Sequence, residues 1–294
     1  MKIVLLTTAT DVWGWGLLDH AFFWWGHIYN MIIDMLTTSP DKFKGGTIWN
    51  VIEKIHGGIV AIGVSLLVIY FLIGLVKTSA TITEVKRPEI AFRLFVRFVI
   101  AKSLVLYSMN IVLLLIEISQ GLTNKIFDLI GTPTAWSTIL SLPKAVSDVI
   151  DSLKWYEHIV MWLPQFIGAL LIVGIGIGIL ISVYGRFFKL FMYIGLSPIP
   201  LASFASSNTQ NMGIIYLKNL ASATLQVSVI ALACVIFQAF LGSGDLGIFT
   251  TDLSNESAMI QLFFYIVEIC LNMIIFFGLV KISDRITKDI LGLH

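Results

Sequence analysis

The sequence alternates long apolar stretches with short polar connections. A helix needs about 20 consecutive apolar residues to cross a bilayer. Stretches of this length recur along the chain, and each predicts a transmembrane helix. The predicted helices cover residues 58–76, about 98–116, 160–184, about 219–241 and 258–280. We therefore expect an all-α, polytopic integral membrane protein with about five transmembrane helices.

Residues 190–206 are also apolar, but this segment is short, and Pro198 and Pro200 interrupt it. Each proline lacks the backbone N–H that a helix interior needs. Non-helical backbone is tolerated at membrane depth only where protein or water covers it. We predict a re-entrant or broken segment within residues 190–218, in place of a further crossing.

A different pattern marks residues 12–36, where aromatic side chains surround a narrow polar stripe. At about 100° per residue, the polar side chains fall on one sector of a helix. They are Asp19, His20, His27, Asn30 and Asp34. Such a helix suits the membrane interface, with its tryptophans at headgroup level. The alternative is a sixth transmembrane helix whose polar stripe faces other subunits.

Composition supports a membrane protein. Hydrophobic residues make up 57% of the 294 residues and charged residues 13%, whereas about a quarter of a soluble domain is charged. The short apolar run after Lys2 does not reach the length of a signal peptide core, so we expect no cleavage. Cys234 and Cys270 both lie in apolar stretches and are interpreted as small buried hydrophobic residues.

The placement of charges orients the chain. Basic residues gather in three connections: Lys77, Lys86, Arg87, Arg93 and Arg97; Arg186 and Lys189; and Lys281, Arg285 and Lys288. The 242–257 connection carries Asp245, Asp252 and Glu256 and no basic residue. Basic connections stay on the cytoplasmic side. We predict that the N-terminus is outside and the C-terminus inside, in the cytoplasmic membrane, and that 190–206 does not cross.

These boundaries divide the chain into five regions. They are an extracytoplasmic or interfacial N-terminal region, two transmembrane helices with a basic loop, a small extracytoplasmic helical region, a membrane domain and a cytoplasmic tail. The corresponding residues are 1–50, 51–116, 117–159, 160–281 and 282–294.

Glu268 lies near the centre of the last predicted helix, with Asn272 on the same helix face. A carboxylate at that depth costs about 3 kcal/mol or more unless it has a polar partner or water. Lys102 and Asn110 interrupt the second predicted helix. One hypothesis is that these four residues line an aqueous path, with Lys102 paired to Glu268. The alternative is a structural bond between packed helices, with Lys102 reaching to the membrane surface.

Gly174 and Gly178 form a small-xxx-small pattern that favours close helix packing, within or between subunits. A cytoplasmic basic face is the other candidate surface, formed by Lys86, Arg87, Arg93 and Arg97. It could bind a cytoplasmic partner or a nucleic acid backbone. Alternatively, it is a topology signal that contacts anionic lipid.

No catalytic motif is recognisable: the sequence has no P-loop, no HExxH and no GxSxG. His20 and His27 are seven residues apart, and a helical metal site needs a spacing of three or four. We expect no enzymatic activity, no catalytic residue, no metal and no cofactor.

The aromatic N-terminus, the outer region after the second helix and the proline-containing segment occur together in one known family. The segment comprises LSPIPLA at 196–202, GIIYLK at 213–218 and Leu225-Gln226. The chain resembles the TrbL-like polytopic membrane components of type IV secretion and conjugative transfer systems, especially the compact versions of Gram-positive conjugative elements. The resemblance covers the whole chain as architecture, and residues 193–226 as sequence.

This resemblance implies a non-enzymatic channel subunit that forms a homo-oligomer. Its partners would be other type IV secretion membrane subunits, cytoplasmic ATPases and transiently the single-stranded DNA with its relaxase. Pro198, Pro200, Tyr216 and Lys218 would lie near the inner mouth of the channel. The outer region of this chain is brief, which leaves little room for the large central domain of some relatives.

Two other classes stay open at this point. A secondary transporter or small-solute permease would show an inverted repeat with broken helices in both halves, and only one half of this chain has such a segment. A structural membrane anchor in a larger complex would tolerate the loss of Glu268.

Overall fold

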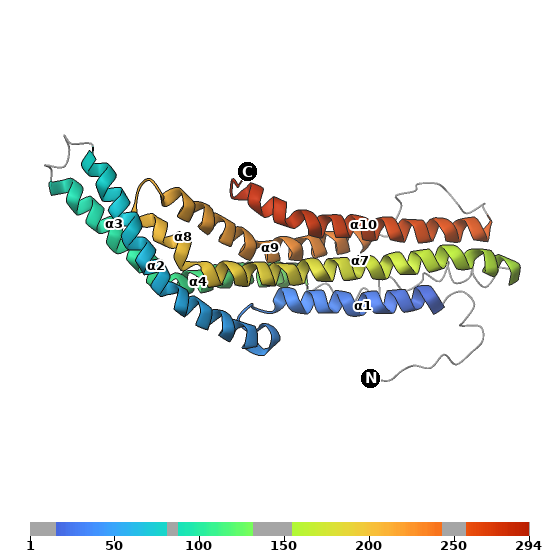
Figure 1. The fold of residues 1–294 in the computed structure, drawn as a ribbon. Coiled ribbons are helices and arrows are strands. Elements are labelled where there is room, and N and C mark those ends of the chain that lie inside the picture. The colour runs from blue at the N-terminus through green and yellow to red at the C-terminus, as the bar shows by residue number, and fades with distance from the viewer. Residues whose placement is uncertain (1–15, 81–87, 132–154, 243–256, 294) are drawn as a thin grey trace. The chain divides into compact units, whose positions relative to one another are not determined.

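The computed structural model describes residues 16–80, 88–131, 155–242 and 257–293, and every regular element among them is helical (Figure 1). The helices are α1 (Gly16–Thr37), η1 (Phe43–Gly46), α2 (Thr47–Ala80), α3 (Pro88–Leu106), α4 (Ser108–Ile130), α7 (Trp155–Leu196), α8 (Pro198–Ala202), η2 (Ser203–Ala205), α9 (Gln210–Gly242) and α10 (Ala258–Ile290).

Among the described residues, four helices are long and apolar enough to cross a membrane, and a bent helix pair could form a fifth crossing. The four are Phe43–Lys77, Ile159–Leu196, Gln210–Phe240 and Met259–Ile290, and the pair is Phe92–Leu106 with Ser108–Ile130. This confirms the prediction of an all-α polytopic membrane protein with about five transmembrane helices.

The prediction of one straight helix over residues 98–116 is wrong. The chain bends by 66° between α3 and α4, around Tyr107. Ser108 Oγ donates to the carbonyl oxygen of Val105 at 2.8 Å, and a serine bonded to its own helix in this way often bends it. The buried ring of His56 on α2 reaches the same hydroxyl, with Nε2 at 2.8 Å from Ser108 Oγ. A side chain from another helix therefore contacts the bend.

The outer region predicted after this helix is only partly described. Helix α4 continues past residue 116 to Ile130, and Gly131 follows it with a φ of +91°. Glycine adopts this left-handed conformation without steric cost and ends the helix. Residues 132–154 lie outside the described part of the chain.

The chain forms two compact units. Unit one comprises residues 1–34, 126–183 and 230–282, and unit two comprises residues 35–125, 184–229 and 283–294.

In unit one, the apolar face of α1 packs on α7 and α10. Trp25 is fully buried, and its ring centroid lies 6.2 Å from that of Phe276 on α10. Phe276 in turn stacks on Phe237 of α9 at 4.7 Å. A Cβ on Gly176 of α7 would lie 3.1 Å from Trp25 and from Ile28. Aromatic side chains on α1, α9 and α10 thus form the centre of this unit.

The predicted amphipathic character of α1 is confirmed. The side chains of its polar stripe that the structure describes are exposed: His20, His27, Asn30 and Asp34. Leu18 lies close to Gly168, and Trp25 lies close to Gly176, so α1 runs lengthwise beside α7 (Figure 1). This packing favours the alternative of a helix that stands beside the transmembrane helices. Its position at the membrane interface stays a prediction.

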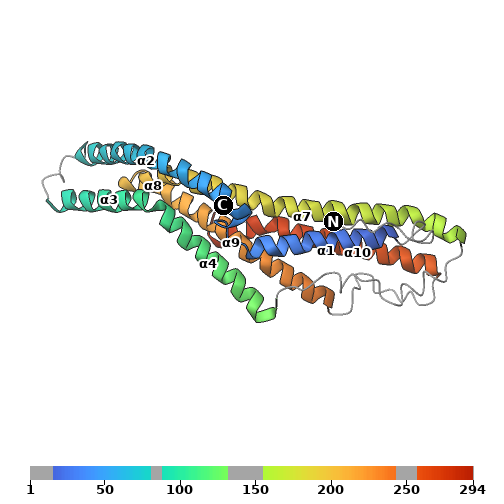
Figure 2. The ribbon, with the colours of Figure 1, turned by 90° about the horizontal axis from the view of Figure 1, so that it is seen from below.

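In unit two, the proline-containing segment packs between α2 and α3 (Figure 2). Residues 190–196, which we placed in the broken segment, continue α7; the break comes at Ser197. Pro198 begins α8, where its missing N–H costs no helical hydrogen bond. The buried core around the segment consists of Leu67, Ala101, Val105, Leu201, Ala202 and Ala205. The predicted break is therefore confirmed, but it is shorter than expected.

Glycines on α2 allow this segment to approach closely. A Cβ on Gly63 would lie 2.7 Å from Pro198 Cβ and 2.9 Å from Pro198 O. A Cβ on Gly74 would lie 3.0 Å from Ser206 Oγ. No side chain fits at Gly63 unless the backbone of the segment moves.

Candidate functional site

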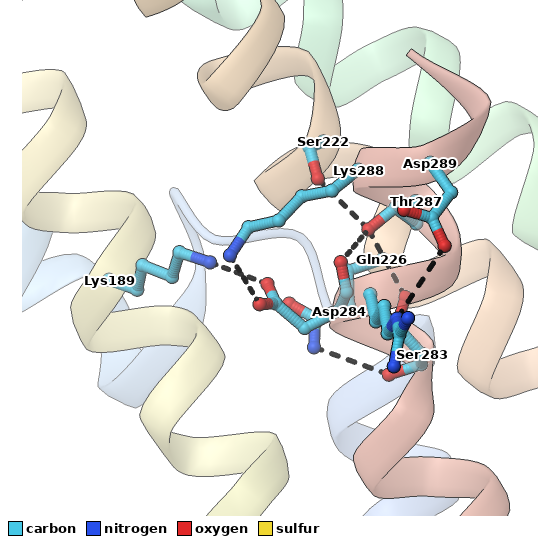
Figure 3. A network of polar contacts seen from close by, with 9 residues as sticks. Lys189, Ser222, Gln226, Ser283, Asp284, Thr287, Lys288 and Asp289 are labelled. Atoms are coloured by element: carbon cyan, nitrogen blue, oxygen red, sulfur yellow. Dashed lines mark hydrogen bonds and ion pairs between the residues drawn. The ribbon is translucent and has the colours of Figure 1, made fainter. Parts of the chain in front are cut away.

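A network of charged and polar side chains joins α7, α9 and α10 in unit two (Figure 3). Asp284 of α10 lies between two lysines. Lys189 Nζ of α7 is 2.5 Å from Asp284 Oδ1, and Lys288 Nζ is 2.8 Å from Asp284 Oδ2. All three side chains are about one third exposed. One carboxylate therefore forms an ion pair with each of two ammonium groups and links α7 to α10.

Hydrogen bonds between α9 and α10 extend this network from the partly exposed ion pairs to buried side chains. Ser222 Oγ donates to Thr287 Oγ1 at 2.9 Å, and Gln226 Nε2 donates to Ser283 Oγ at 3.3 Å. These four residues are buried. Polar side chains that bond across helices stabilise packing in a membrane, where an unpaired polar group is costly.

Asp284→Asn is expected to lower the free energy of unfolding by about 1 kcal/mol, because it leaves two lysines without their shared counter-charge. High salt should reduce the difference from the wild type, since these groups are partly exposed and salt screens them. Thermal unfolding of the full-length protein in detergent, at low and high salt, measures both effects.

Asp289→Asn is the matched control, because Asp289 is more exposed and its Oδ2 lies 3.8 Å from Arg285 Nε. We expect no measurable change from it. Equal effects of the two substitutions would contradict a bridging role for Asp284.

The proline-containing segment is held by polar contacts to its neighbours in unit two. Tyr216 donates its hydroxyl to the carbonyl oxygen of Tyr193 at 2.7 Å, which ties α9 to the last turns of α7. Thr209 Oγ1 donates to the carbonyl oxygen of Ser203 at 2.7 Å. Of the remaining predicted residues here, Pro198 is buried, and Pro200 and Lys218 are half-buried. The structure gives Tyr216 a positioning role that the sequence did not specify.

The predicted basic face is only partly free. Arg97 Nη2 donates to Gln210 Oε1 at 2.5 Å, so this arginine fixes the start of α9. Arg93 is exposed on α3, and Lys86 and Arg87 lie outside the described residues. Docking of a partner at this face stays a prediction. Arg93 is the residue of this face that the structure describes as exposed.

The four polar residues predicted to line a path lie in different units. Lys102 and Asn110 are exposed in unit two, on α3 and α4. Glu268 is half-buried and Asn272 is buried on α10 in unit one. The Lys102–Glu268 pair therefore stays a prediction.

Two buried amides in unit one need explanation. The side-chain oxygen and nitrogen atoms of Gln165 and of Asn272 are buried and have no hydrogen-bond partner within the described part of the chain. Buried polar groups are costly unless they are hydrogen-bonded. In the sequence, the signal for Gln165 is an amide inside an otherwise apolar stretch, a type of residue that often bonds packed helices together.

The two glycines of the small-xxx-small pattern have different surroundings. Gly178 contacts Phe277 of α10, as a packing role requires, since a Cβ there would lie 3.1 Å from that ring. Gly174 is exposed and has nothing within 4 Å, so its role between subunits stays a prediction. The close contacts of α7 use Gly168 and Gly176 instead. Gly168 and Gly176 are eight residues apart, about two helical turns, so they lie on the same side of α7. The small-xxx-small pattern does not include this spacing.

In the described ranges, no group of three or more His, Cys, Asp or Glu side chains could hold a metal ion. Cys234 and Cys270 are free and buried, which confirms their interpretation as hydrophobic residues.

Comparison with known proteins identifies a family to which the chain is similar. A family model described as TrbL/VirB6 plasmid conjugal transfer like protein matches residues 28–198, more than half of the chain. The match ends at Pro198, so it contains little of the 193–226 segment that carried the sequence resemblance. No curated protein and no solved structure matches the chain. The chain is a multi-pass membrane protein and belongs to the TrbL/VirB6 plasmid conjugal transfer-like family, whose members are components of conjugal transfer systems.

Proposed function

We propose that this protein is a channel or scaffold subunit of a type IV secretion machine in the cytoplasmic membrane. It helps single-stranded DNA with its relaxase to cross that membrane, and it has no enzymatic activity. The observation that carries the proposal is the family match over residues 28–198, on a chain with about five apolar crossings. The N-terminus lies outside and the C-terminus inside.

The polar groups among the apolar helices of unit one support a role beyond anchoring. Asn272 and Gln165 bury amide atoms that have no partner among the described residues, and Glu268 is half-buried on the same helix as Asn272. In the assembled machine, water or neighbouring subunits would supply hydrogen-bond partners for the two amides, Gln165 and Asn272. A homo-oligomer built through α1 and the exposed Gly174 would bring such groups toward a shared interior.

Unit two supports the second part of the proposal, which is contact with the cytoplasmic ATPases. Its basic connections would face the cytoplasm, and Arg93 is exposed there. The segment that begins at Pro198 is packed on α2 and α3, and the Lys189–Asp284 pair ties α7 to α10. A partner that binds unit two would therefore affect several helices at once, because these contacts connect them.

Deletion of the gene from donor cells tests the function. We expect conjugative transfer to fall to background and to recover when the gene is supplied in trans. Unchanged transfer after deletion would contradict the proposal and would lead to solute-uptake assays for a permease.

The intramembrane polar residues are tested by Glu268→Gln and Lys102→Met in the complementing gene. We expect transfer to fall by about tenfold or more. Each change removes a charged group from a membrane helix, where charged groups are rare and usually functional. The measurement is transfer frequency, normalised to the amount of protein in the membrane.

Glu117→Gln and Lys125→Met are matched controls, since both residues are exposed on α4. They should leave transfer unchanged. Full transfer by both test variants, at normal protein levels, would remove Lys102 and Glu268 from the mechanism.

A further inference from the structure

Helix α1 packs along the middle of α7 in unit one (Figure 1). A Cβ on Gly168 of α7 would lie 3.8 Å from Leu18 Cδ2. A Cβ on Gly176 would lie 3.1 Å from Trp25 and from Ile28. The contacting residues advance along both helices together, so α1 and α7 run side by side in the same direction.

The depth of α1 in the membrane follows from that of α7. The segment Ile159–Leu196 is long and apolar enough to cross a membrane, and the apolar stretch 160–184 has its centre at Ile172. The two glycines that contact α1 lie four residues to either side of Ile172. At 1.5 Å per residue, each is about 6 Å from that centre, whereas the hydrocarbon core is about 30 Å thick. Residues 18–28 of α1 therefore lie near the middle of the bilayer, not in the interface plane.

The exposed face of α1 at this depth is polar. His20 and His27 are exposed, and Asn30 continues the same face three residues further along. No hydrogen bond or ion pair joins these three side chains to another described residue. Phe23 shares the face, and its ring packs edge-on against that of His27 with the centroids 4.6 Å apart. Two imidazoles thus point away from the packed helices close to mid-membrane.

Lipid tails cannot satisfy such a face, because an imidazole or an amide without a hydrogen-bond partner is costly in hydrocarbon. A histidine side chain is also too short to reach the membrane surface in the way that lysine and arginine do. The exposed side chains of α7 at the same level are apolar by contrast, as Leu170 and Ile177 show. Unit one therefore has one face that suits lipid and another that suits water.

We propose that the polar face of α1, formed by His20, His27 and Asn30, lines a water-filled path through the membrane. Water gives these side chains the hydrogen-bond partners that lipid lacks. Water at this depth must be enclosed by protein, and further copies of the chain present the same face to complete the wall. The inference deepens the proposed function, on which it rests for what passes along the path. The contact of this face with water does not depend on DNA transfer.

The test measures whether single cysteines on α1 meet water in the membranes of donor cells. The full-length protein carries Cys234→Ala and Cys270→Ala, followed by His20→Cys or His27→Cys. The probe is a membrane-impermeant, charged methanethiosulfonate reagent. A cysteine reacts as its thiolate, which forms in water and is strongly disfavoured in hydrocarbon. We expect both cysteines to be labelled in intact membranes.

Leu170→Cys and Ile177→Cys are the matched controls, because both residues are exposed on α7 at the same depth. They should react at least about tenfold more slowly than the cysteines on α1, since they face lipid. Labelling after solubilisation in denaturant shows that every cysteine is chemically competent. Asn30→Cys decides the question if one of the histidine variants does not reach the membrane.

Transfer frequency in the same cells separates this inference from the proposed function. If deletion of the gene abolishes transfer while the α1 cysteines react no faster than the α7 controls, the protein serves transfer but α1 lines no path. If the α1 cysteines react rapidly while deletion leaves transfer unchanged, the face meets water and the proposed function fails.

Two results would overturn the inference: equal labelling of the α1 and α7 positions, or no labelling of any of the three α1 positions. In the second case, a disulfide between two copies through His27→Cys would assign the face to a dry contact between subunits.

Discussion

Gly63→Ala is expected to destabilise the protein by about 1–3 kcal/mol, as overpacking of a well-packed core does. The new Cβ would lie 2.7 Å from Pro198 Cβ and 2.9 Å from Pro198 O. Neither atom belongs to a flexible side-chain end, so α8 must move away from α2. This movement would open the core cluster that contains Leu67 and Leu201. The midpoint of thermal unfolding in detergent measures the loss, and transfer frequency reports whether the displaced segment matters for function.

Gly58→Ala on the same helix separates the contact from the helix propensity of alanine. A Cβ at Gly58 meets nothing within 4 Å, and alanine favours a helix over glycine by up to about 1 kcal/mol. We expect this variant to be as stable as the wild type or more stable. If Gly63→Ala behaved like Gly58→Ala, the close packing of α2 on the proline-containing segment would be disproved.

Trp25→Ala is expected to cost about 3–5 kcal/mol, the usual range for truncating a fully buried large aromatic side chain. Trp25 is 0% exposed, and its ring lies 6.2 Å from Phe276 and 6.4 Å from Tyr29. Its removal leaves a cavity where α1, α7 and α10 meet. We expect α1 to detach first, which would show as faster proteolytic cleavage within residues 16–37 and as a lower midpoint of unfolding.

Trp24→Ala provides the control from the adjacent position. Trp24 is 55% exposed and lies about 100° around α1 from the buried Trp25. Substitutions at exposed positions usually change stability by less than about 0.5 kcal/mol. A large loss from Trp24→Ala with little loss from Trp25→Ala would mean that α1 presents its other face to the unit.

Several features of this protein follow from the sequence alone. The apolar stretches predicted the membrane-crossing helices, because an apolar stretch of that length has few other stable environments and its backbone must bond internally. The polar stripe from His20 to Asp34 predicted the exposed face of α1, since helical periodicity is local. Pro198 predicted a break, because a missing N–H acts at its own position.

The tertiary structure decided the rest, and packing between distant residues is the physical reason. His56 contacts Ser108 at the bend between α3 and α4, Arg97 binds Gln210, and Asp284 bridges Lys189 and Lys288. The partners in the longest of these contacts are more than a hundred positions apart, and no local pattern specifies such a pair. Whether a glycine packs or stays exposed, as Gly176 and Gly174 do, depends on which neighbouring helix lies opposite it. Helix type and apolar face are properties of a segment, whereas its contacts exist only once the helices have assembled.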